Sequence, residues 1–135
     1  FTQSPRLLSP NLIALRSRLR STRVEKIFAL KCASHHYSTY RDASSPALIQ
    51  RDSMDNEPDE NILAIFQWIL AGTGRDIPRE VCAEETARQS AGSGSCGIAA
   101  LNFIESEIDE EVARWTDSAS HLFRRRALRD LVVFH

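Results

Sequence analysis

The clearest periodic pattern in the chain lies between residues 59 and 71. Apolar residues recur there at the i, i+3, i+4, i+7 and i+8 spacing of an amphipathic helix. Asp59 precedes the pattern as a helix-start signal, and Gly72 and Gly74 follow it as stop signals. The pattern predicts a helix over 59–71 whose apolar face consists of Ile62, Leu63, Ile65, Phe66, Trp68, Ile69 and Leu70.

Short apolar and β-branched stretches upstream of this helix predict strands. They cover residues 24–31, 36–41 and 47–51, with turn residues at 42–46 between the second and the third. Short strands with tight connections are typical of an antiparallel meander. A further short strand is indicated around 81–83.

Three more segments have helical spacing. They are a short helix over about 11–22, a helix over about 95–107 and a last helix over about 117–132. The pattern therefore predicts helices together with a few short strands in an antiparallel meander.

Composition indicates one compact globular domain. The chain has 135 residues, of which 42% are hydrophobic and 26% charged, with a net charge of −1. No apolar run approaches a membrane span and no signal peptide is recognisable, so no membrane partner is expected. The chain begins with Phe1 rather than Met, so we expect it to be a piece of a longer protein.

The cysteines indicate a reducing compartment. Cys32, Cys82 and Cys96 are odd in number and show no CxxC pair, which argues against both a disulfide framework and a zinc site. We therefore expect an intracellular protein, in the nucleus or cytoplasm. No metal and no cofactor are expected.

Arginines cluster at both ends of the chain. Residues 1–23 hold five arginines and no acid, and residues 124–129 hold four more. Either cluster could bind an acidic partner or nucleic acid, and either could be a solvated helix face. No aromatic residue is interleaved with these arginines, which argues against base stacking and favours the solvated faces.

A glycine- and serine-rich loop leads directly into the helix predicted at 95–107. It runs from Gln89 to Gly97 and places Cys96 in the first helical turn. Unpaired N–H groups and the positive end of the helix dipole favour a thiolate there. The alternative is a small buried hydrophobe at a helix start.

A cysteine nucleophile needs a base and a group that orients the base. His35 and His36 stand at the start of one predicted strand, and Asp52 stands at the end of the next. In an antiparallel pair these two places lie side by side. Gln89 lies on the glycine loop, from which its amide could donate to a developing oxyanion.

This ordered set resembles the SUMO-specific (ubiquitin-like protein) cysteine protease family, and most closely its divergent fungal members. The family pattern is His-Trp, then Asp-Ser-Leu, an amphipathic helix, and Gln followed by Asp-Cys-Gly. This chain has His36-Tyr37, Asp52-Ser53-Met54, the helix at 59–71, and Gln89 ahead of Ser95-Cys96-Gly97. The likeness covers about residues 24–130.

The resemblance implies the α+β class and a papain-like cysteine protease fold, in which the cysteine helix packs on a short antiparallel sheet. It implies Cys96 as nucleophile, His36 as base, Asp52 as the group that orients the imidazole, and Gln89 in the oxyanion hole. Tyr37 would cover the substrate's glycine tail. The reaction would be hydrolysis of a peptide or isopeptide bond after the C-terminal Gly-Gly of a ubiquitin-like modifier, so the expected partner is that modifier or its conjugates.

Four positions depart from the family pattern. Tyr37 replaces Trp, and Ser95 replaces Asp before the cysteine. Gln89 is seven residues before Cys96 where six is usual, so either the loop has an extra residue or Gln89 is not the donor. His35 has the more usual spacing to Asp52, but we favour His36 because an aromatic residue follows it.

The resemblance divides the chain into a basic N-terminal edge over 1–23 and the C-terminal part of a protease catalytic domain over 24–135. The elements that normally precede the histidine strand in the family are mostly missing. Two functions therefore compete. One is an active cysteine peptidase, and the other is a catalytically inactive relative that binds a modifier or another protein. A small nucleic-acid module is the third and weaker reading.

Overall fold

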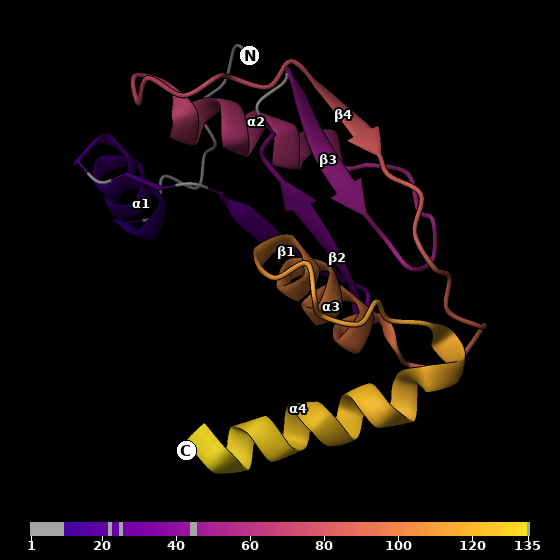
Figure 1. Ribbon diagram of the computed structural model, residues 1–135. Helices are drawn as coiled ribbons and strands as arrows, with labels where there is room; N and C mark the ends of the chain where they lie inside the picture. Colours follow the sequence, from indigo (N-terminus) through magenta and orange to yellow (C-terminus); the bar gives the residue numbers. More distant parts are fainter. Residues whose placement is uncertain (1–9, 22, 25, 44–45, 135) are drawn as a thin grey trace. The chain divides into compact units, whose positions relative to one another are not determined.

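The computed structural model describes residues 10–21, 23–24, 26–43 and 46–134, the last five of these by their backbone alone. The first nine residues of the predicted basic edge, and residues 44–45 of the predicted turn, lie outside this described part. The elements follow one another along the chain (Figure 1) as α1 (Pro10–Ser21), β1 (Phe28–Ala33), β2 (His36–Arg41), β3 (Ala47–Arg51), α2 (Glu60–Leu70), β4 (Glu80–Ala83), α3 (Cys96–Ile108), η1 (Asp117–Ala119) and α4 (Ser120–Phe134).

Most predicted elements are confirmed within a few residues. The Asp59 carboxylate accepts a hydrogen bond from the Asn61 N–H at 2.9 Å and so caps α2, as a short polar side chain before a helix does. The first strand was predicted over 24–31, but β1 runs from Phe28 to Ala33. The last predicted helix begins with the one-turn helix η1 before α4. None of the described helices is long and apolar enough to cross a membrane.

The four strands form one sheet in the order β1-β2-β3-β4. Two residues, Ser34 and His35, connect β1 to β2, and both have positive φ, at 52° and 60°. Such a two-residue turn joins antiparallel strands and matches their twist. The arrows of β2 and β3 point in opposite directions in Figure 1. β4 differs from the predicted antiparallel sheet, because it pairs with β3 in parallel register.

The chain divides into two compact units. The first contains residues 1–29, 40–50 and 57–83, and the second contains residues 30–39, 51–56 and 84–135. The core of the first unit is apolar and includes the predicted face of α2. Its buried residues are Leu19, Ile27, Tyr40, Leu48, Leu63, Phe66, Ile69 and Leu70.

The second unit has a smaller apolar cluster around α3. Ala99, Phe103 and Trp115 are its buried members. The apolar stripe in the sequence of this helix does not coincide with the buried face, because Leu101 is 45% exposed and Ile108 is 73% exposed. The buried positions of α3 are Cys96, Ala99, Ala100, Asn102 and Phe103, so the apolar spacing predicts the helix but not its inner side.

Candidate active site

Cys96 lies at the first position of α3, where the sequence predicts a helix start. The residue is 7% exposed, and its thiol donates a hydrogen bond to the carbonyl oxygen of His35 at 3.7 Å. Cys32 and Cys82 are free and exposed. The first N–H groups of a helix have no acceptor inside it and carry the positive end of the dipole. Of the three cysteines, Cys96 is the one that stands at a helix N-terminus.

The two adjacent histidines have different surroundings. His35 belongs to the turn and is exposed. His36 opens β2, and its Nε2 lies 2.7 Å from Asp52 Oδ1. An ionised carboxylate can only accept hydrogen bonds, so Nε2 carries the proton of this pair. In the neutral ring Nδ1 then holds the lone pair. Nδ1 is buried and has no hydrogen-bond partner among the described residues.

Asp52 is held in place by its own loop. Its side chain is 4% exposed. Oδ1 also accepts the Met54 N–H at 2.7 Å, and Oδ2 accepts the Asn56 amide at 3.2 Å. The Met54 contact is an Asx turn, in which an aspartate bonds to its own backbone two residues on. These two hydrogen bonds fix the orientation of the carboxylate that faces His36.

Gln89 is tied to the residue that follows Asp52. The Gln89 N–H donates to the Ser53 carbonyl oxygen at 2.9 Å, and the Ser53 hydroxyl donates to Gln89 Oε1 at 2.6 Å. With its oxygen engaged, the side-chain amide keeps its two N–H groups as donors. Sequence reasoning noted Ser53 only as part of a motif. Its part in orienting Gln89 became clear from the contacts.

Tyr37 lies beside the start of α3. A Cβ atom placed on Gly97 would be 3.9 Å from the Tyr37 ring, and Tyr37 is 37% exposed. A side-chain hydrogen bond with Cys32, and next the charge of the Cys32 thiolate, raise the pKa of Tyr37 above its ordinary value. The ring is thus an accessible apolar surface next to Cys96.

These contacts lie within the second unit and bring the sequence-predicted residues into one cluster. His36 contacts Asp52, and Gln89 contacts Ser53, the residue after Asp52. The Cys96 thiol contacts the backbone of His35, the residue before His36. The structure does not join the Cys96 thiol to His36 by a hydrogen bond. No group of three or more metal-ligating side chains occurs in the described part of the chain.

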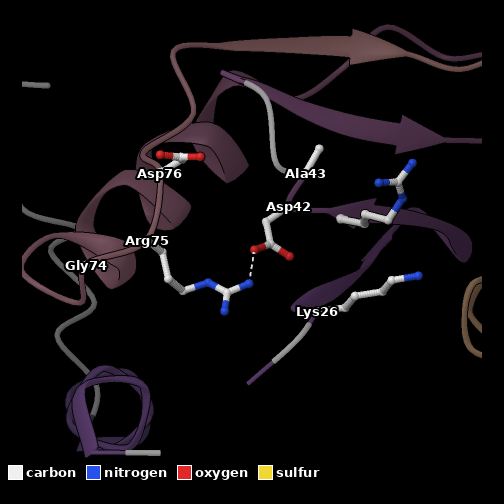
Figure 2. A pocket seen from close by; sticks show the side chains of 7 residues that line it. Lys26, Asp42, Ala43, Gly74, Arg75 and Asp76 are labelled. Carbon is white, nitrogen blue, oxygen red and sulfur yellow. Dashed lines mark hydrogen bonds and ion pairs between the residues drawn. The ribbon is translucent and has the colours of Figure 1, made fainter. Parts of the chain in front are cut away.

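Two hollows in the molecule lie away from this cluster. In the first unit a hollow of about 380 Å³ is lined by charged residues (Figure 2). Figure 2 shows the Asp42 carboxylate facing the Arg75 guanidinium, which lies 2.5 Å from it. Asp42 also accepts the Ile27 N–H at 2.7 Å, so its charge serves the fold. A second hollow, of about 440 Å³, is lined by Arg51, Asn102, Phe103 and Trp115 among others. Neither is lined by Cys96 or His36.

Comparison with known proteins supports the fold. No family model matches the chain, and no curated protein matches it in sequence. A solved structure of the C-terminal Ulp1 protease domain in complex with Smt3, the yeast ortholog of SUMO, is similar to it with a TM-score of 0.61 at 15% identity. The likeness covers 88% of this chain, which spans 59% of the length of that one. The chain therefore has an α+β fold similar to that of the Ulp1 protease domain.

Proposed function

We propose that the chain is a cysteine peptidase that cleaves the bond after the C-terminus of a SUMO-like modifier. Assignment to the SUMO-specific protease family, and to its divergent fungal members, is part of this proposal. The setting proposed is the reducing interior of the cell. The observation that carries the peptidase proposal is the His36–Asp52 pair, in which Nε2 and Oδ1 lie 2.7 Å apart. The second ring nitrogen, Nδ1, is buried and has no partner among the described residues. This pair lies beside a helix that begins at Cys96.

The unpartnered nitrogen supports a role for His36 as base. A buried polar atom without a hydrogen bond costs roughly 1–3 kcal/mol. The Cys96 thiol would offset this cost by turning from the His35 carbonyl toward His36 Nδ1. In that state the proton passes to Nδ1, leaving a thiolate and an imidazolium that Asp52 stabilises. The same pairing favours the nucleophilic form of the cysteine.

The reaction follows from these positions. The thiolate attacks the carbonyl carbon of the modifier's last glycine, and the oxyanion accepts hydrogen bonds from the Gln89 amide and the Cys96 N–H. His36 then gives its proton to the departing amine as the C–N bond breaks, which leaves a thioester. A water molecule, deprotonated by His36, hydrolyses the thioester and restores the thiol. Tyr37 would cover the glycine tail during both steps.

A second function, modifier binding without hydrolysis, is supported by a specific contact. The Cys96 thiol donates to the His35 carbonyl rather than to the His36 ring. A chain whose thiol stays on that carbonyl would bind a modifier and leave it intact.

One experiment separates the two functions. The chain is incubated with a SUMO-type modifier extended beyond its C-terminal Gly-Gly by a short peptide, and with the same modifier ending in an electrophile. The peptidase proposal expects release of the peptide and labelling of Cys96, both lost in Cys96→Ala. Saturable binding of the modifier with neither cleavage nor labelling supports the second function. Absence of binding and cleavage contradicts both.

A further inference from the structure

The loop that leads to Cys96 has little regular structure of its own. Gly92 and Gly94 both have positive φ, at 73° and 65°. Ser93 N–H donates to the Ser90 carbonyl oxygen at 3.1 Å and closes a single turn. Glycines lose more backbone freedom on ordering than other residues. A loop of this composition therefore needs outside contacts to hold the peptide before Cys96 in one position.

Ser95 stands immediately before α3, but it does not cap the helix with its side chain. A serine at this position usually accepts a hydrogen bond from the second or third helical N–H. Ser95 is 1% exposed, and its hydroxyl instead accepts a hydrogen bond from Arg124 Nη2 at 3.1 Å. The hydroxyl next to Cys96 is thus oriented by a side chain from α4.

Arg124 also contacts the loop two residues earlier, at Ser93. The same Nη2 donates to the Ser93 carbonyl oxygen at 3.0 Å. Asp117, in η1, contacts the other end of the loop. A hydrogen bond from the Ser90 side chain, joined by one from the Ser90 backbone and by the charge of Arg124, lowers the pKa of Asp117. Two residues of η1 and α4 therefore contact the loop, Asp117 at Ser90 and Arg124 at Ser93 and Ser95.

We propose that Arg124 is a positioning residue for Cys96, acting through Ser95 and the Ser93 carbonyl. This inference rests on the proposed peptidase function. Arg124 touches neither the thiol nor the imidazole by any contact described above. Arg124 fixes the peptide group between Ser95 and Cys96. The N–H of this group donates to the oxyanion, and its orientation sets the direction of the Cys96 side chain.

The expected consequence is a selective loss of turnover. A displacement of about 1 Å in a catalytic group can cost roughly 100-fold in rate. Removing one of several anchors should displace the loop by less, so we expect kcat to fall about 10-fold. KM should stay within about 2-fold, since a group acting only in the transition state changes kcat.

The experiment compares four variants of the chain: Arg124→Gln, Arg124→Lys, Ser95→Ala and, as the matched control, Arg125→Gln. Arg125 is the exposed neighbour on α4. Readouts are kcat and KM on the extended modifier, the iodoacetamide rate at Cys96 with Cys32 and Cys82 as references, and the thermal midpoint. We expect Arg124→Gln to lower kcat and slow Cys96, Arg124→Lys to recover part of both, Ser95→Ala to show a smaller loss, and Arg125→Gln to match the parent.

Three results would overturn the inference. The first is equal behaviour of Arg124→Gln and Arg125→Gln in both readouts. The second is a rise in KM at constant kcat, which would make Arg124 a binding residue. The third is a lowered midpoint with faster labelling of all three cysteines and no recovery by Arg124→Lys, which would make its role structural. If the parent chain does not cleave the modifier, the peptidase proposal fails, and the Cys96 labelling rates still decide the role of Arg124.

Discussion

The two units of this chain are stabilised in different ways. In the first, the core consists of eight buried apolar residues of the described part, which come from α1, α2, the sheet and Ile27 just before β1. In the second, the buried apolar residues are few and mostly small. All of the buried polar residues described except Asp42 and Gln50 lie in the second unit: Ser38, Thr39, Arg51, Asp52, Ser53, Ser95, Asn102 and Ser120.

The polar groups of the second unit are joined by directed contacts. Asn102 donates to the Ala113 carbonyl and accepts from the Trp115 N–H, each at 2.7 Å. Trp115 Nε1 donates to Ser120 at 2.9 Å. Buried polar groups are costly unless paired, so such a network fixes geometry closely. One unit is therefore stabilised mainly by apolar burial, while the other holds its polar side chains at fixed positions through directed contacts.

The largest expected effect is on activity alone. Cys96→Ala should reduce cleavage of the extended modifier by roughly 10⁴-fold or more, because the nucleophile is removed. It removes one sulfur atom from a site already held by polar contacts, so the unfolding free energy should change by less than about 1 kcal/mol. Cleavage rates and urea unfolding are measured together, with Cys82→Ala as control. Retained cleavage would mean that Cys96 is not the nucleophile.

The next largest effect should be on the apolar core of the first unit. Phe66 is 2% exposed and lies in the buried face of α2. Phe66→Ala should cost about 3–5 kcal/mol, the usual range for emptying a buried aromatic site. The loss, followed by denaturant unfolding, should be the same at low and high salt. A salt-dependent loss, or one below about 1 kcal/mol, would contradict an apolar origin.

The second unit should respond differently at Arg51, whose side chain is 10% exposed. Its guanidinium lies 3.0 Å from both Glu84 and Glu107. Arg51→Met would remove the guanidinium that contacts both carboxylates, one of which is largely buried. We expect a loss of about 3 kcal/mol, at the low end of the range for a broken buried pair.

Added salt should recover part of that loss by screening the two carboxylates from each other. Arg51→Met combined with Glu107→Gln should be less destabilised than the single variant. An unchanged or increased loss in the double variant would show that the network does not contribute through charge.

Some features of the fold follow from the sequence pattern, and others do not. The face of α2 followed from periodicity, since apolar burial decides it. The buried side of α3 did not, because Ala99 and Ala100 are buried while Leu101 is exposed. The parallel pairing of β4 with β3 also does not follow from the sequence, because periodicity identifies a strand and not the strand beside it.

The residue order names the histidines, Asp52, Gln89 and Cys96 as candidates for a site. It does not reveal the turn with positive φ at Ser34 and His35, which separates the surroundings of His35 and His36. For Arg124 the sequence pattern favours a solvated helix face. Its contact with Ser95 joins residues 29 positions apart, and no local pattern marks such a pair.

The smallest expected effect concerns Tyr37 and Cys32 at the edge of the second unit. Because the folded state raises the pKa of Tyr37 above its ordinary 10.0, any stability from this contact is complete below that pH. It is lost as the pH rises through the folded pKa. Cys32→Ala should move the phenolate titration back toward 10.0. Absorbance is compared with a Tyr37→Phe variant to isolate this residue, and an unmoved titration would exclude Cys32 as the cause.

The central claim is that His36, held by Asp52, activates Cys96. The most direct measurement is the iodoacetamide rate of each cysteine from about pH 5 to 9, a range that brackets the free thiol pKa near 8.5. Cys96 should react with a lower apparent pKa than Cys82 in the parent chain. His36→Ala should abolish that difference, Asp52→Asn should reduce it, and His35→Ala should leave it. A Cys96 that labels no faster than Cys82, or one affected by His35→Ala and not by His36→Ala, would contradict the account.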